Sequence, residues 1–140
     1  MLKMKFITIL LLACNFVACG QFSQNHSHKT LTEMDTKKIT NNIAKSALEA
    51  WQSGNSKLWI SYFAENPKLL DDGNPRNFQD FSTNVIGHER FTSIDKVEDN
   101  GLSIYGYFHT EEWGDFKAYF KFHINQDGKI YLLEIGQAHY

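Results

Sequence analysis

Apolar residues recur at every fourth position in the segment that follows residue 38, at Ile39, Ile43, Ala47 and Trp51. This period places the four side chains on one face of a helix. Asp35 or Thr36 can cap the start of that helix, because a short polar side chain accepts hydrogen bonds from the N–H groups of the first turn. Gly54 ends it. The pattern therefore predicts an amphipathic helix.

Two more helices and a short strand are predicted in the next part of the chain. The second helix begins at Asn55 or Ser56, and its apolar residues are Leu58, Trp59, Tyr62 and Phe63. A short strand starts at Leu69 and is stopped by a run of turn-forming residues at 71–75. The third helix is expected over residues 77–85.

The remainder of the chain reads as sheet, because β-prone runs alternate with glycine-containing turn signals. The four predicted strands cover residues 90–97, 102–110, 116–125 and 129–138. Their simplest arrangement is an antiparallel meander. In the third strand one face carries Phe116, Ala118, Phe120 and Phe122, and the other carries Lys117, Tyr119, Lys121 and His123. Successive side chains of a strand point to opposite faces, so we expect the apolar face to meet the helices.

The N-terminus has a different pattern. Lys3 and Lys5 precede an apolar run over residues 6–13, which is typical of a secretory signal. The run is too short for a membrane-spanning helix, which needs about 20 apolar residues. Cys14 and Cys19 each follow an alanine, and this arrangement resembles the lipobox of a bacterial lipoprotein signal.

We assign lipidation to Cys19, with Cys14 as the alternative. Lipidation at Cys14 would leave an apolar core at the low end of the usual range of about 7–15 residues. In favour of Cys14, Leu11 suits the position three residues before a lipobox cysteine better than Phe16 does. No cysteine follows Cys19, so no disulfide is expected in the mature domain.

These features divide the chain into a signal peptide (1–18), a lipidated cysteine with a flexible tether (19–35) and one domain (36–140). Removing the signal takes away two lysines and leaves 12 basic and 16 acidic residues, a formal charge of −4. That balance argues against nucleic acid as a partner. His26 and His28 form a His-x-His pair in the tether, but no other ligand type accompanies them, so no metal site is expected.

The order helix, helix, short strand, helix, long meander resembles the nuclear transport factor two-like (SnoaL-like) superfamily over residues 39–138. The stretches that carry the resemblance are 59–72, 86–96, 127–130 and 133–135. The resemblance implies an α+β fold in which a cone-shaped, curved antiparallel sheet wraps around about three N-terminal helices. It also implies a pocket at the open end of the cone, used by different members for isomerisation, cyclisation, dehydration, epoxide hydrolysis or binding alone. Fold therefore does not decide the reaction.

Three residues are candidates for acid/base catalysis. Asp72, or its neighbour Asp71, falls where isomerase-like members carry their proton-abstracting aspartate, although the same residues also form an ordinary turn. His88, followed by Glu89, starts the sheet and can place an imidazole and a carboxylate at the mouth of the cone, or it can form a salt bridge or hydrogen bond at the strand edge. Glu134 lies among apolar residues of the last strand, either as a buried acid or as an outward partner for a lysine.

Aromatic residues that face inward are the candidates for ligand contact. They are Trp59, Phe63, Phe108, Phe120 and Phe122, with Trp51 and Tyr62 as further possibilities. Aromatic residues at these spacings also form ordinary cores. The sequence contains no nucleophile motif, metal set or phosphate loop, so we expect a cofactor-free, membrane-anchored module that binds a small apolar ligand or a peptide segment. The alternative is a cofactor-independent isomerase, cyclase or dehydratase.

A homodimer is expected through the polar face of the sheet, as in many members of the superfamily. Tyr105, Tyr107, Tyr119 and His123 lie on this face. Tyrosine suits interfaces because it combines a large contact area with a polar group. The alternative is a monomer whose aromatic residues pair across strands at the surface.

Replacing the lipidated cysteine tests the anchor directly. We expect Cys19→Ser to abolish incorporation of a labelled fatty acid, because serine lacks the thiol that receives the lipid. Cys14→Ser is the matched control and should label normally. The reverse result would move the lipidation site to Cys14.

Overall fold

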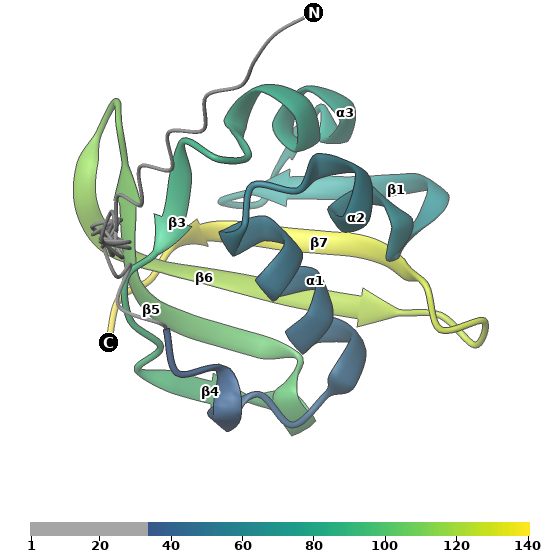
Figure 1. Ribbon diagram of the computed structural model, residues 1–140, viewed down its shortest axis with the longest axis horizontal. Helices are drawn as coiled ribbons and strands as arrows, with labels where there is room; N and C mark the ends of the chain where they lie inside the picture. The colour runs from purple at the N-terminus through teal and green to yellow at the C-terminus, as the bar shows by residue number, and fades with distance from the viewer. Residues whose placement is uncertain (1–33) are drawn as a thin grey trace, which may run out of the picture.

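Residues 34–140 are described by the computed structural model, and they form a curved, unclosed sheet with short helices packed on one face (Figure 1). The α+β cone predicted from the sequence is confirmed. The predicted signal peptide, Cys14, Cys19 and nearly all of the predicted tether lie outside the described residues. None of the helices between residues 34 and 140 is long and apolar enough to cross a membrane.

Asparagine side chains start the helices in the first half of the domain. The elements are a 3₁₀ turn η1 (Thr36–Lys38), α1 (Asn42–Gln52) and α2 (Ser56–Ser61). The Asn41 side chain accepts hydrogen bonds from the N–H groups of Ile43 and Ala44, and Asn55 accepts one from Leu58. Gly54 has a φ of +69° and turns the chain from α1 into α2.

The first two predicted helices are each shorter than expected. The helix predicted from residue 36 is interrupted, because Asp35 caps only η1 and Asn41 caps a separate helix. The interruption lies against Gly101, where a side chain would collide with Thr40 and Asn41. Phe63, predicted as helical, instead begins a strand and pairs with Ile130.

The third predicted helix forms in two parts. It consists of α3 (Phe78–Asp80) and a π-helix η2 (Phe81–Val85), in which the N–H of Ile86 donates to the carbonyl of Phe81 at 3.3 Å. Gly87, with a φ of +89°, ends the segment and lies against Gly54. The turn between α1 and α2 therefore holds the end of η2 in place.

The sheet contains seven strands in the order β2-β1-β7-β6-β5-β3, with β4 also paired to β5. Their bounds are β1 (Phe63–Asp71), β2 (Asn74–Arg76), β3 (Glu89–Phe91), β4 (Lys96–Glu98), β5 (Ser103–Thr110), β6 (Gly114–Ile124) and β7 (Ile130–Gln137). All pairs are antiparallel except β1 with β7, which is parallel. β1 thus joins the four predicted strands of the meander at the β7 edge, and the sheet is mixed.

The strand predicted over residues 90–97 is split into β3 and β4. Between them the backbone of Ser93 comes so close to Gly106 of β5 that any side chain at this glycine would collide with it. Thr92 and Asp95 still donate to carbonyls of β5, at 2.8 and 2.9 Å. The segment is therefore a bulge that keeps both halves on the same neighbour.

Aromatic rings fill the space between the helices and the sheet. Trp51 of α1 stacks on Phe81 of η2 at 4.6 Å between ring centroids, and meets Trp59 of α2 and Phe120 of β6 edge-on. The predicted division of β6 is confirmed at Ala118, Phe120 and Phe122, which are buried, whereas Phe116 on the same face is only partly buried. The residues between them are partly exposed. The inward face of β6 thus forms the sheet side of the core.

Candidate functional site

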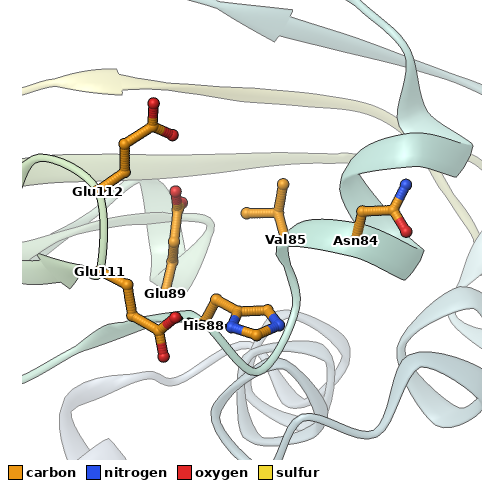
Figure 2. Close-up of a pocket in the computed structure, with 6 residues that line it drawn as sticks. All are labelled: Asn84, Val85, His88, Glu89, Glu111 and Glu112. Atoms are coloured by element: carbon orange, nitrogen blue, oxygen red, sulfur yellow. Dashed lines mark hydrogen bonds and ion pairs between the residues drawn. The ribbon is translucent and has the colours of Figure 1, made fainter.

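A cleft of about 300 Å³ opens at one end of the domain. Three segments line it: the end of η2, the start of β3 and the loop between β5 and β6 (Figure 2). The lining residues are Asn84, Val85, His88, Glu89, Glu111 and Glu112. We take this cleft as the candidate functional site.

Local hydrogen bonding brings the three segments together. The N–H of His88 donates to the carbonyl of Val85 at 3.0 Å, which forms a tight turn around Gly87. Glu89 then pairs with Thr110 at the start of the β3–β5 ladder. Because Thr110 is the last residue of β5, the loop that follows it returns to the mouth of the cleft.

The His88 imidazole and the Glu111 carboxylate form an exposed ion pair at the cleft. His88 Nδ1 lies 2.9 Å from Glu111 Oε2, and the two side chains are 61% and 64% exposed. Exposed ion pairs contribute at most about 1 kcal/mol to stability. This pair therefore lies at the rim of the cleft, where water reaches both side chains.

Glu89 is the half-buried acid of the cleft. Burial raises the pKa of its carboxyl group above the ordinary value, and the Arg76 guanidinium partly opposes this shift. The negative charges of Asp71 and Glu112 raise the pKa further. Asp71 holds Arg76 in a 2.7 Å ion pair, so the arginine is shared between two carboxylates.

The apolar wall of the cleft connects it to the core. Val85 and Phe81 are the last and first residues of η2, so they lie one turn apart on the same short helix. Phe81 is fully buried, and the Arg76 guanidinium lies 4.9 Å from the centre of its ring. Phe81 thus contacts the core and also lies close to the charge of Arg76.

Of the three predicted catalytic residues, only His88 lies at the cleft. Asp72 occupies the left-handed turn between β1 and β2, with a φ of +47°, and its Oδ1 accepts a hydrogen bond from the N–H of Gln137 at 3.0 Å. Glu134 lies on the outer face of the sheet, where His123 Nε2 is 3.3 Å from its carboxylate. Both carboxylates thus have structural partners away from the cleft. Their catalytic roles stay predictions.

The aromatic residues predicted to contact a ligand form the core, and none of them lines the cleft. Their exposed fractions are 0% for Trp59, 5% for Phe63, 4% for Phe108, 1% for Phe120 and 2% for Phe122. Their rings pack on one another at centroid distances of 4.6 to 6.3 Å. A pocket wall and a packed core both require inward apolar residues, so the sequence pattern cannot distinguish them.

The sequence pattern predicted no site at Asn84, Val85, Glu111 or Glu112, all of which line the cleft. The feature of the sequence that could have located these residues is the predicted hairpin between residues 110 and 116. Pairing residue 89 with the last residue of the following strand brings the hairpin loop to His88. That register is fixed by the bulge at Ser93, which leaves no mark in the pattern of apolar residues.

The chemistry of the cleft is set by its charge. Three carboxylates and one imidazole line it, so it favours cations and hydrogen-bond donors over anions. Among residues 34–140, no three side chains of the types His, Cys, Asp and Glu come together as a group that could hold a metal ion. Burial raises the pKa of the half-buried Glu89 carboxyl in this lining.

Comparison with known proteins finds the fold but no closer relationship. No family model matches the sequence, and no curated protein is significantly similar to it. A nuclear transport factor 2-like protein of unknown function from Cytophaga hutchinsonii superposes with a TM-score of 0.56 at 12% identity, over 76% of this chain and 93% of that one. A SnoaL-like protein of unknown function from Burkholderia thailandensis gives 0.53 at 12%, over 73% and 99%.

The same fold occurs within a larger protein. The orange carotenoid protein of Anabaena (Nostoc) sp. PCC 7120, in a structure binding canthaxanthin, superposes with a TM-score of 0.54 at 18% identity. The match covers 69% of this chain and 35% of that one, so this chain spans about a third of the carotenoid protein. Together these structures show that the chain has the nuclear transport factor two-like fold.

The buried carboxyl of Glu89 makes stability depend on pH. Because folding raises its pKa, the folded state binds more protons than the unfolded state above the ordinary value of 4.5, and the free energy of unfolding falls as the pH rises through the raised pKa. We expect Glu89→Gln to match the parent in stability below pH 4.5 and to exceed it at neutral pH. Urea unfolding between pH 4 and 8 measures this difference.

Glu112→Gln is the matched control, because the charge of Glu112 contributes to the raised pKa of Glu89. It should move the stability change of the parent to lower pH without removing it. If the stability difference between Glu89→Gln and the parent is constant across the pH range, the pKa of Glu89 is not raised by folding.

Proposed function

We propose that this chain is a binding module of the bacterial cell envelope. In this proposal the lipid on Cys19 holds it to a membrane, and the cleft at the mouth of the cone takes a small ligand or a segment of a partner protein. The observation that carries the binding function is the cleft itself. Its volume of about 300 Å³ is at the lower end of the range for small-molecule sites, which is about 300–1,000 Å³.

The positions of the ionisable groups favour binding over catalysis. His88 and Glu111 are well exposed and pair with each other, so water screens their charges. Acid/base catalysts work best where water is excluded, because hydrogen bonds and charges are stronger there. Asp72 and Glu134 each have a structural partner elsewhere, and neither lines the cleft with His88.

The fold and the N-terminus support the remaining parts of the proposal. A protein with the same fold binds canthaxanthin, an apolar ligand, which supports ligand binding by this architecture. The basic and apolar N-terminal residues with an Ala-Cys pair support export and lipidation. A tether of residues 20–35 would then place the domain at the membrane surface.

Filling the cleft tests the binding function. We expect molecules extracted from the purified lipoprotein, and identified by mass spectrometry, to be lost in Val85→Arg, because the longer side chain occupies the cleft. Leu58→Arg is the matched control, since Leu58 is an apolar residue with 43% exposure that does not line the cleft. Equal recovery from Val85→Arg and the parent, with folding verified by circular dichroism, would reject the cleft as the binding site.

A cofactor-independent enzyme is the second candidate, and the raised pKa of Glu89 favours it. A carboxyl group that gains its proton more readily than usual suits proton transfer between carbon atoms in isomerases, cyclases and dehydratases. The molecule extracted from the parent protein distinguishes binding from catalysis. Conversion of the bound molecule by the parent but not by Glu89→Gln supports the enzyme, whereas retention of the unchanged molecule by both supports the binding module.

We also propose that the outer face of the sheet forms a homodimer. Lysine side chains lie over tyrosine rings on this face: Lys96 over Tyr105 at 4.4 Å, and Lys121 over Tyr119 at 5.1 Å. Tyr107 is 48% exposed beside them. Such a surface combines aromatic area with charge, as protein interfaces do.

Analytical ultracentrifugation tests the dimer. The parent should sediment as a dimer at high micromolar concentration, and Tyr107→Asp should shift it toward the monomer by placing a charge in the interface. Leu58→Asp, on the helical side of the domain, should leave the dimer intact. If the parent sediments only as a monomer at that concentration, the proposed homodimer is wrong.

A further inference from the structure

Trp113, in the loop between β5 and β6, is a large aromatic side chain left in water. Its exposed fraction is 73%, whereas Trp51 and Trp59 are fully buried. Tryptophan is highly buried on average, because its ring offers a large apolar area for packing. It is also among the residue types most enriched at the energetic centres of protein interfaces. The exposure of Trp113 therefore requires an explanation.

A buried threonine fixes the loop that carries Trp113. The Oγ1 of Thr110, a residue with 2% exposure, accepts a hydrogen bond from the backbone N–H of Trp113 at 2.8 Å. The same hydroxyl donates to the carbonyl of Gly114 at 3.2 Å. Gly114 has a φ of +75°, which a residue without a side chain adopts at little cost. The backbone of Trp113 is thus positioned in advance, and this lowers the ordering cost of binding.

Unpaired carboxylates lie beside this loop. Glu111 and Glu112 directly precede Trp113, and both line the cleft together with Glu89 (Figure 2). Within the described part of the chain, Glu111 is paired with His88, whereas no ion pair holds Glu89 or Glu112. The surface next to the exposed indole therefore carries negative charge that its own neighbours leave unmatched.

An indole beside carboxylates suits a cation. A guanidinium or ammonium group is attracted to the face of a tryptophan ring, and carboxylates accept strong hydrogen bonds from it. The charges of Glu111 and Glu112 also argue against Trp113 as a contact for an anionic membrane surface, because like charges repel. The expected partner of this surface is thus basic.

The positions of the indole and the cleft indicate the size of the partner. Trp113 does not belong to the six residues that line the cleft, although it follows Glu112 directly. A ligand that reaches both the cleft and the indole must therefore extend beyond the cleft. A peptide segment with basic side chains has this extension, and a small amine does not.

We propose that the β5–β6 loop docks an extended segment of a partner protein that carries arginine or lysine. This inference rests on the binding function proposed above and names the partner of that site. One basic side chain of the segment enters the cleft beside Glu89 and Glu112, and the adjoining part of the segment packs on the indole of Trp113.

An array of random heptapeptides tests the class of partner. When the array is probed with the purified full chain, we expect the bound peptides to carry arginine or lysine several times more often than the array as a whole. Binding should weaken between about 0.1 and 1 M salt, where the Debye length falls from about 10 to about 3 Å. Bound peptides without an excess of basic residues would overturn the inference.

Two pairs of variants locate the contact. Trp113→Ser should weaken binding of the selected peptides about tenfold, as loss of an interface tryptophan does. Tyr131→Ser, which removes an aromatic residue of 46% exposure on β7, should leave it unchanged. Glu112→Gln should reduce the preference for basic peptides, whereas Glu65→Gln, an exposed acid on β1, should retain it. Equal effects within either pair would place the peptide elsewhere.

Quenching of tryptophan fluorescence by acrylamide separates the other occupants. Trp113 dominates this signal because Trp51 and Trp59 are buried. The selected peptides should protect Trp113 from the quencher. Equal protection by putrescine, a small diamine, or by vesicles of phosphatidylglycerol would overturn the proposed segment in favour of a small cation or a membrane.

Failure of this inference can be told apart from failure of the proposed function. If Val85→Arg loses the extracted molecules while the array shows no excess of basic peptides, the cleft binds a ligand but the basic segment is wrong. If Val85→Arg recovers the same molecules as the parent and the array again shows no such excess, both the proposed function and this inference fail.

Discussion

The stacking of Trp51, Trp59, Phe81 and Phe120 is the interaction on which the rest of the domain depends. Each ring comes from a different element, so their contact joins α1, α2, η2 and β6. These helices contain 11, 6 and 5 residues, and helices of such length are not stable in water by themselves. Burial of the rings fixes the helices on the sheet. It thereby sets the position of η2, and with it one wall of the cleft.

Local patterns predicted the elements better than their pairing. The alternation in β6 identified its buried face because each residue carries that signal in its own polarity. The parallel pairing of β1 with β7 joins residues more than sixty positions apart, and no local pattern encodes it. Phe63 shows the result: its spacing fits a helix, but its pairing with Ile130 places it in a strand.

His88 is the predicted catalytic residue that lines the cleft, and it combined position and chemistry already in the sequence. His88 follows a helix-ending glycine and begins the sheet, so both its place at the edge and its imidazole were visible in the sequence. Val85 has no distinctive chemistry, and its role depends on the π-helical turn that directs it to the cleft. For Asp72 the sequence left a catalytic carboxylate and an ordinary turn as alternatives, because a turn and an active site use the same residue types. The structure shows it bonded to the backbone of Gln137.

The parallel pairing of β1 with β7 also determines the order in which the chain can fold. Synthesis delivers residues 63–71 long before residues 130–137, so β1 must wait for its neighbour β7 until nearly the whole domain has been made. During that interval its inward residues Phe63 and Leu69, both buried in the finished domain, have no sheet to cover them. Closing so long a loop slows folding, because its entropic cost precedes the contacts that compensate for it. Until β7 is made, the first strand has only the short β2 as a partner, so its other edge is open to pairing with another chain.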